Sequence, residues 1–316
     1  MSASVTSPIA GAATRPTSGA DQTPPRDYAA LAARIRAAVE PRRSIASLRV
    51  YGRQVVPGSL DATGEAYDLF IVRIPAAGST GAARRSGARF SVMLNGGTHG
   101  DEPAGAHAIV RFLEERRDTR WPDIEFVLTP CTNPWGYVHN RREGPGGLDL
   151  NRSFRRATPK TPEVSLLKRA LRGRSFDLYL DCHEDVDAPG LYVFAPQALG
   201  RAIVQVAGRL GPLHQGDLVD GEIPLDGGVV VLDSERARER QRGWNTWPLP
   251  FYVARYHQRS GVTSLGVDRP EAPPSAEEPQ LRATATIETP THLPLDQRVA
   301  MHLAALDAAL STLTEK

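Results

Sequence analysis

Short apolar runs alternate along the chain with segments whose apolar residues recur at helical spacing. Runs typical of strands cover 48–55, 66–73, 89–94, 124–129, 176–181 and 283–287. Helical patterns cover 28–39, 103–115, 163–171 and 299–313. This alternation favours an α/β fold in which helices cover both faces of a largely parallel sheet. Ligands of such sheets gather beyond the carboxyl ends of the strands, so functional residues are expected in the turns that follow strands.

The chain divides unequally. Residues 1–26 are rich in Ser, Thr, Ala, Gly and Pro without periodicity, which predicts a flexible leader. Asp27 can cap the first helix, and structure should begin there. From 212 to 281 the pattern weakens, and only a strand at 229–232 is indicated. A chain of 316 residues is compatible with one large domain, which we expect over 27–316.

Composition excludes several classes of function. The 38 basic and 36 acidic residues leave a net charge of +2, too little for a nucleic-acid or membrane partner. Two cysteines, Cys131 and Cys182, make neither a disulfide framework nor a four-thiolate zinc site. The N-terminus lacks the basic start and apolar stretch of a secretory signal, and no run reaches the roughly 18 apolar residues of a membrane helix. We therefore expect a cytoplasmic protein.

The turn after the strand at 89–94 carries the first candidate metal ligands. His99 and Glu102 supply one nitrogen and one oxygen ligand, and Pro103 can start the helix that follows. The pattern His-x-x-Glu is a weak indicator by itself.

A second histidine follows the strand at 176–181. In extended backbone, His183 faces the same way as Asp181 and opposite to Cys182, which we assign to the core. His183 would complete a His, Glu, His set, which leaves zinc an open position for water. The alternative is a histidine that is merely hydrogen-bonded at a strand end.

Polar residues also follow the other two strands. Arg152 with Asn151 suits recognition of a substrate carboxylate, while an arginine near a metal could stabilise an oxyanion. Asp149 could accept a hydrogen bond from a ligating histidine. Glu288, directly after 283–287, is a plausible general base beside a zinc-bound water. The alternative for the arginines and for Glu288 is a solvated surface position.

Together and in this order, the four segments resemble the zinc metallocarboxypeptidases of the funnelin type. They are similar, more distantly, to the aspartoacylase and succinylglutamate desuccinylase group. The resemblance implies a mixed, mainly parallel eight-stranded sheet sandwiched by helices, with 27–316 as the catalytic domain. It implies one Zn²⁺ per chain, held by His99, Glu102 and His183, and it assigns Glu288 as the general base and acid.

The resemblance also implies how substrate is held. Asp149 matches the carboxylate that supports the first histidine, and Asn151 with Arg152 match the pair that binds the terminal carboxylate of the substrate. The oxyanion arginine of the family precedes that Asn by nine positions, which indicates Arg142, with the adjacent Arg141 as the alternative.

Two departures from the family concern aromatic residues. Trp135 stands where bacterial members usually carry Asp. For the lid tyrosine of the larger digestive enzymes, Tyr252 and Tyr256 are only candidates.

We expect hydrolysis of the C-terminal amide bond of a peptide or peptide-like substrate with a free carboxylate. The chain ends 28 residues beyond Glu288, without room for the β-domain that the desuccinylase group appends. The alternatives are an N-acyl-amino-acid deacylase and a zinc-binding protein without turnover. Asp185 or Asp187 would favour a basic substrate residue if either lines the pocket.

Overall fold

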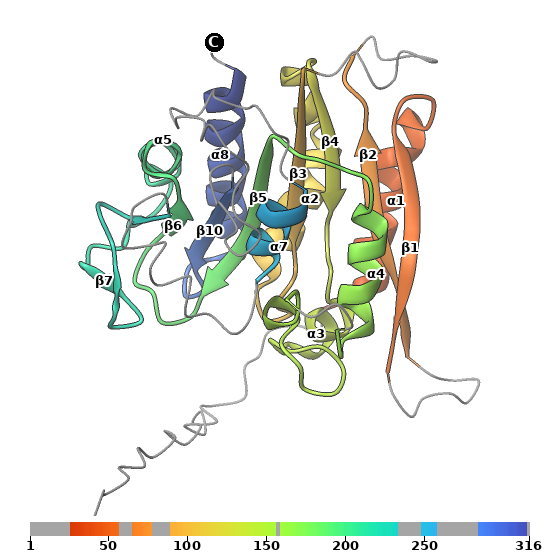
Figure 1. The fold of residues 1–316 in the computed structure, drawn as a ribbon, viewed down its shortest axis with the longest axis horizontal. Helices are drawn as coiled ribbons and strands as arrows, with labels where there is room; N and C mark the ends of the chain where they lie inside the picture. The colour runs from red at the N-terminus through yellow and green to blue at the C-terminus, as the bar shows by residue number, and fades with distance from the viewer. Residues whose placement is uncertain are drawn as a thin grey trace, which may run out of the picture.

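The computed structural model describes residues 26–56, 65–77, 89–155, 159–232, 248–257 and 284–314 (Figure 1). The predicted leader lies outside these ranges except for Arg26. The boundary of the leader is therefore still a prediction.

The described residues form strands and helices that alternate through most of the chain. The strands are β1 (Ser47–Val55), β2 (Ala66–Ile74), β3 (Phe90–Gly96), β4 (Ile124–Thr129), β5 (Leu178–Asp185), β6 (Tyr192–Ala195), β7 (Leu218–Val219), β8 (Ile223–Pro224), β9 (Val229–Val231) and β10 (Thr284–Pro290). The helices are α1 (Tyr28–Val39), α2 (Pro103–Glu114), α3 (Pro134–His139), α4 (Pro162–Leu171), α5 (Gln197–Ala207), α7 (Leu249–Tyr256) and α8 (Leu295–Thr314). Short 3₁₀ turns cover Glu40–Arg42, Arg117–Arg120 and Leu150–Arg152.

Eight of these strands form one mixed sheet in the order β1-β2-β4-β3-β5-β10-β6-β9. The four central strands β4, β3, β5 and β10 are parallel. The pairs β1–β2, β2–β4 and β6–β10 are antiparallel, while β6 and β9 are parallel. The eight-stranded α/β fold expected from the sequence is confirmed.

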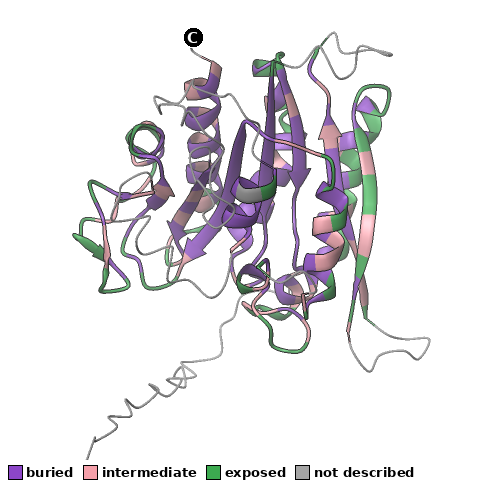
Figure 2. Ribbon diagram, viewed as in Figure 1, coloured by how far each residue is buried: buried purple, intermediate pink, exposed green. Residues whose placement is uncertain are grey.

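Helices cover both faces of the sheet (Figures 1 and 2). Residues of α1, α2, α5 and α8 pack on one face in a single core cluster, and residues of α4 and α7 pack on the other. β3 shows why this happens: Val92 and Leu94 belong to the first cluster and Met93 to the second, because alternate side chains of a strand point to opposite faces. Strands buried on both faces are typical of parallel sheets.

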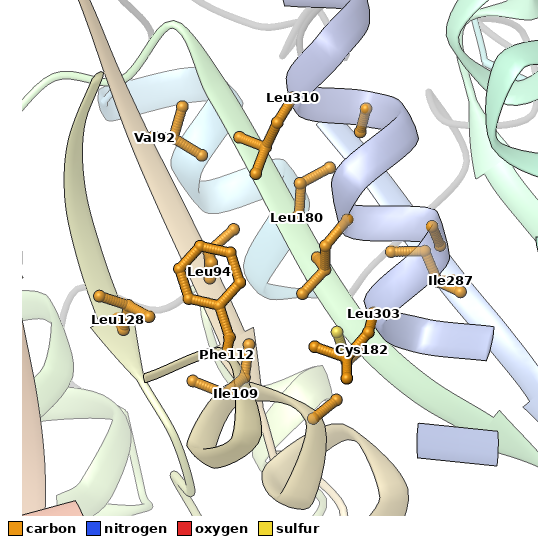
Figure 3. Packing of buried hydrophobic residues seen from close by; sticks show 14 of the residues in the cluster. Val92, Leu94, Ile109, Phe112, Leu128, Leu180, Cys182, Ile287, Leu303 and Leu310 are labelled. Atoms are coloured by element: carbon orange, nitrogen blue, oxygen red, sulfur yellow. The ribbon is translucent and has the colours of Figure 1, made fainter. Parts of the chain in front are cut away.

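The larger core lies between the central strands and the helices α2 and α8. Figure 3 shows Phe112 of α2 and Leu310 of α8 directed at the side chains of β3 and β5, among them Leu94 and Leu180. No helix in the described ranges is long and apolar enough to cross a membrane.

Two strands run further than the sequence pattern indicates. β5 and β10 pair in parallel from Tyr179 opposite Thr284 to Asp185 opposite Pro290. His183 and Glu288 therefore lie inside strands, although the pattern predicts strand ends at 181 and 287. Ladder hydrogen bonds do not depend on apolar side chains, so apolar runs end before the strands do.

Candidate active site

The chain reverses its direction of travel across the sheet at β3. After β3 it forms β4 on one side of that strand and then returns to form β5 on the other. The carboxyl ends on the two sides of such a switch point diverge and leave room for a ligand. Gly96 at the end of β3 pairs with Cys182 of β5, and His183 of β5 pairs with Glu288 of β10. The segments that carry the candidate site residues therefore meet at the carboxyl ends of the central strands, where the arrow of β5 ends in Figure 1.

His99, Glu102 and His183 form a compact cluster at the carboxyl ends of these strands. One donor atom of each lies within 4.8 Å of the others, and all three residues are buried. The Nδ1 atom of His99 lies 2.6 Å from Glu102 Oε1, and that of His183 lies 2.7 Å from Glu102 Oε2. The two Nδ1 atoms are 3.2 Å apart. Two nitrogens and a carboxylate so arranged could hold one metal ion.

The second ring nitrogen of each imidazole, Nε2, which points away from Glu102, lies near a carboxylate. His99 Nε2 lies 3.3 Å from Asp149 Oδ1, and His183 Nε2 lies 3.2 Å from Asp181 Oδ2. The other oxygen of Asp181 accepts a 2.7 Å hydrogen bond from Asn95 Nδ2. A carboxylate behind an imidazole keeps the proton on the nitrogen nearest to it and presents the lone pair of the other to a metal. The contact of His99 with Asp149 is of this kind, and both rings turn Nδ1 toward Glu102.

Asp181 is a site residue that the sequence pattern does not single out. A signal is present, because residues two apart in a strand share a face, and the Asp181 and His183 side chains are expected on one side. What the sequence cannot supply is that the two groups lie within contact distance.

The electrostatics of the cluster suit a cation. Burial raises the pKa of Glu102, but His99 and His183 outweigh it and hold the pKa well below its usual range. Burial lowers the pKa of His183, but Asp181 and Glu102 outweigh it and hold the pKa well above its usual range. The carboxylates around His183 thus stabilise positive charge on its imidazole. Mixed nitrogen and oxygen donors suit Zn²⁺ and similar transition metals, so the residues present fit such an ion.

Arg142 extends toward this cluster from the loop after α3. Its NH1 donates to Glu102 Oε1 at 3.2 Å, and its Nε donates to Asp149 Oδ2 at 3.3 Å. Burial lowers the pKa of Arg142, but Glu102, Asp149 and other nearby carboxylates outweigh it and raise the pKa. The neighbouring Arg141 is exposed. Of the two arginines that the sequence offers, the structure thus brings Arg142 to the cluster.

Glu288 lies near the same carboxyl ends of the strands, in β10, which is next to β5. It is directly opposite His183 on one side and opposite Tyr192 of β6 on the other. Burial raises the pKa of Glu288 well above its usual range, and Glu102 and Asp185 add to this, while His183 and Arg142 oppose it. A raised pKa is the direction of shift that suits a carboxyl group to general acid and base catalysis.

Asn151 and Arg152 lie at the border of the cluster. The Asn151 backbone N–H donates to Asp149 Oδ1 at 2.7 Å, and its side-chain oxygen accepts from Leu249 N at 2.8 Å. Asn151 is buried, whereas Arg152 is exposed and donates a long bond, 3.4 Å, to the Asn151 carbonyl. The pair is thus adjacent to the cluster, with the guanidinium on the solvent side.

The other candidates have different surroundings. Tyr252 is buried, with its ring 5.7 Å from that of Phe154 and below Lys168, so it packs in a core cluster; Tyr256 is exposed. Asp185 accepts a 2.8 Å hydrogen bond from the Tyr192 hydroxyl, and Asp187 is exposed.

A family model matches the part of the chain that carries most of the candidate site. Residues 80–171 match a family model described as "Protein of unknown function (DUF2817)". That stretch includes six of the candidate site residues: His99, Glu102, Arg142, Asp149, Asn151 and Arg152. No curated protein matches the sequence.

Solved structures share the fold across most of the chain. A candidate metallopeptidase from Shewanella amazonensis SB2B is 19% identical, with a TM-score of 0.65 over 92% of this chain and 95% of the other. A second one, from Shewanella denitrificans OS217, is 19% identical, with a TM-score of 0.63 over 90% of each chain. A metallo-carboxypeptidase from Burkholderia cenocepacia is 16% identical, with a TM-score of 0.55 over 91% of this chain and 68% of the other. The chain has a metallopeptidase-like fold, and the resemblance to carboxypeptidases is confirmed at that level.

Proposed function

We propose that the protein is a zinc-dependent metallocarboxypeptidase that removes the C-terminal residue of a peptide or peptide-like substrate. The observation that carries this proposal is the convergence of His99, Glu102 and His183 with Glu288 at the switch point of a metallopeptidase-like sheet. A metal site with only structural purpose normally closes with four protein ligands. Here three candidate ligands lie beside a carboxyl group with a raised pKa and beside an arginine.

His99, Glu102 and His183 would hold one zinc ion in the proposed enzyme. When bound, the ion would supply Lewis-acid activation of the attacking water and of the scissile carbonyl. Asp149 and Asp181 lie next to the Nε2 atoms of His99 and His183 and would support the two imidazoles when the ion is bound.

Glu288 and Arg142 are assigned the proton transfer and the stabilisation of charge. Glu288 accepts the proton of the attacking water and later donates it to the leaving amine, for which a raised pKa is an advantage. Arg142 stabilises the negative charge that develops on the carbonyl oxygen, since its guanidinium already lies at the Glu102 carboxylate.

Asn151 and Arg152 are assigned the terminal carboxylate of the substrate. The Asn151 side-chain oxygen is engaged with Leu249, so its NH₂ group is the part that a carboxylate would meet. Arg152 is exposed at the border of the cluster, where an incoming carboxylate can form a bidentate contact.

A mixed peptide library incubated with zinc-loaded protein tests the proposal. Mass spectrometry should show loss of single C-terminal residues, and the apo-protein should leave the library unchanged. Release of acetate or succinate from acyl-amino acids instead would replace the proposal with a deacylase. Zinc binding without turnover of either substrate class would contradict an enzymatic role.

A further inference from the structure

Gln54 is a buried polar side chain in an unexpected place. It lies in β1, the edge strand of the sheet, where its neighbours on both sides in sequence are exposed, yet Gln54 itself is 0% exposed. Its Oε1 accepts a 2.7 Å hydrogen bond from the Trp135 backbone, and its Nε2 donates a 3.0 Å bond to Asn133 Oδ1. A buried amide is costly unless it is hydrogen-bonded, and both ends of this one are used.

Asn133 continues the chain of contacts. Its Oδ1 also accepts from Gly136 N at 3.1 Å, in the first turn of α3. Its Nδ2 donates to two backbone carbonyls, those of Arg142 at 3.2 Å and Glu143 at 3.0 Å. The two donors and two acceptor positions of the amide are therefore all occupied, which fixes its orientation. Asn133 itself is 0% exposed.

The guanidinium of Arg142 needs such an anchor. Its hydrogen bonds to Glu102 and Asp149 are long, and each of these two carboxylate groups also contacts His99. The side chain of Arg142 is 39% exposed, so contacts along its length restrict it little. The position of its backbone therefore decides where the guanidinium lies, and an error of about 1 Å in a positioned group can cost on the order of 100-fold in rate.

We infer that Gln54 and Asn133 are positioning residues that fix the backbone at Arg142 and thereby aim its guanidinium at the metal cluster. The series of hydrogen bonds runs from Gln54 in β1 through Asn133, just before α3, to the backbone at 142–143. Its effect on turnover rests on the proposed function, while its effect on the loop does not.

The first test measures the loop directly. Gln54→Leu removes the bonds to Trp135 N and Asn133, and Asn133→Asp removes the two donations to the carbonyls. Arg53→Gln is the matched control, because Arg53 is the exposed neighbour on the opposite face of β1. Hydrogen–deuterium exchange should rise about tenfold or more in peptides covering 140–149 for the first two variants. Exchange in β5 and the zinc content should not change, and the control should match wild type.

A kinetic test separates positioning from a general loss of stability. Gln54→Leu should lower kcat by roughly tenfold or more with little change in KM. In an Arg142→Ala background the same substitution should cost less than about twofold, because the group it positions is gone. If Gln54→Leu fails to fold, Gln54→Glu replaces it, since the carboxylate still accepts from Trp135 N but cannot donate to Asn133.

Two results would overturn the inference. One is unchanged exchange at 140–149 in both variants. The other is an equal fold-loss of kcat with and without Arg142. If wild type has no turnover, the proposed function fails, and the exchange experiment still decides whether Gln54 and Asn133 hold the loop.

Discussion

Asp181 is expected to support the site through a candidate metal ligand, His183. It lies behind His183 as Asp149 lies behind His99, so each imidazole faces a carboxylate with its Nε2 atom. Asp181 is 0% exposed and is itself held by Asn95. Such support is expected to raise the basicity of the ligand and to fix its ring.

Asp181→Asn should therefore weaken zinc binding by about 10 to 100-fold, because the amide cannot serve the same charge-assisted contact. The measurement is a competition titration of the apo-protein against a chelator of known affinity. His107→Gln is the control, since His107 is a histidine that contacts Tyr137 and Arg34 rather than the cluster, and it should keep its zinc. Equal zinc affinity in Asp181→Asn and wild type would remove Asp181 from the site.

Arg152 tests the exopeptidase assignment at the same scale. Arg152→Ala should reduce kcat/KM for a peptide with a free C-terminus by an amount worth a few kcal/mol, since a charge-assisted contact is lost. The peptide amide should be affected much less. Kinetics on matched acid and amide peptides measure this preference, and Arg155→Ala, an exposed arginine nearby, is the control. If Arg152→Ala and wild type discriminate equally between the two peptides, Arg152 is not the anchor.

At the scale of elements, the site depends on a close approach between α2 and β5. Glu184 joins them: its backbone N–H donates to Glu102 Oε2 at 3.0 Å, and its Oε2 accepts from Ala104 N at 2.6 Å. Gly105, in the first turn of α2, makes the approach possible. A Cβ at this position would lie 2.5 Å from the carbonyl oxygen of Cys182, the residue before His183.

Gly105→Ala should destabilise the fold by about 1 to 3 kcal/mol, because backbone atoms of β5 cannot move aside without a shift of the strand. The same shift should separate Glu102 from His183 and weaken zinc binding. Chemical denaturation and the chelator titration measure the two effects. On helix propensity alone, Ala would stabilise a helix by about 1 kcal/mol relative to Gly, so a more stable variant would contradict the packing argument.

Elements differed in how well the sequence predicted them, for identifiable reasons. α2 begins at the expected Pro103, and α8 carries the expected apolar stripe. The sequence pattern does not indicate α5, although Leu199, Ile203 and Ala207 are buried at helical spacing in the structure. The pattern does not indicate β6 either, because its four residues are too few for an alternation of apolar and polar residues to be distinguished from chance.

At the scale of the whole molecule, the cluster residues were predictable because each follows an apolar run that ends at the same edge of a parallel sheet. His99, Glu102 and His183 form one cluster, and Glu288 pairs with His183 in the neighbouring strand, while the roles of these residues stay predictions. Gln54 could not be predicted in the same way. Its role depends on the packing of β1 beneath a loop about 80 residues further along the chain, which no local pattern encodes.

The limits of the folded unit can be tested by truncation. We propose that the catalytic domain begins at Asp27, and the composition of 1–25 predicts that this segment adds no apolar core. Arg26 differs, since its guanidinium donates to the carbonyl of Gly100 in the turn after β3 and lies over the Tyr137 ring. Deletion of residues 1–25 should leave the melting temperature and turnover unchanged. Arg26→Ala should lower the melting temperature.

Calorimetry and peptide turnover measure both outcomes. A loss of several degrees in the deletion variant would show that residues 1–25 contribute to the folded protein.

The central claim is that one metal ion at His99, Glu102 and His183 works with Glu288 to hydrolyse a C-terminal amide bond. Turnover of a peptide, measured as zinc is added to the apo-protein, tests it most directly. We expect turnover to rise in proportion to bound zinc and to stop rising at one ion per chain. Glu288→Gln should bind zinc equally well but lose at least about 100-fold in kcat, the scale of general acid and base catalysis. Turnover by the zinc-free protein, or an undiminished rate in Glu288→Gln, would contradict this claim.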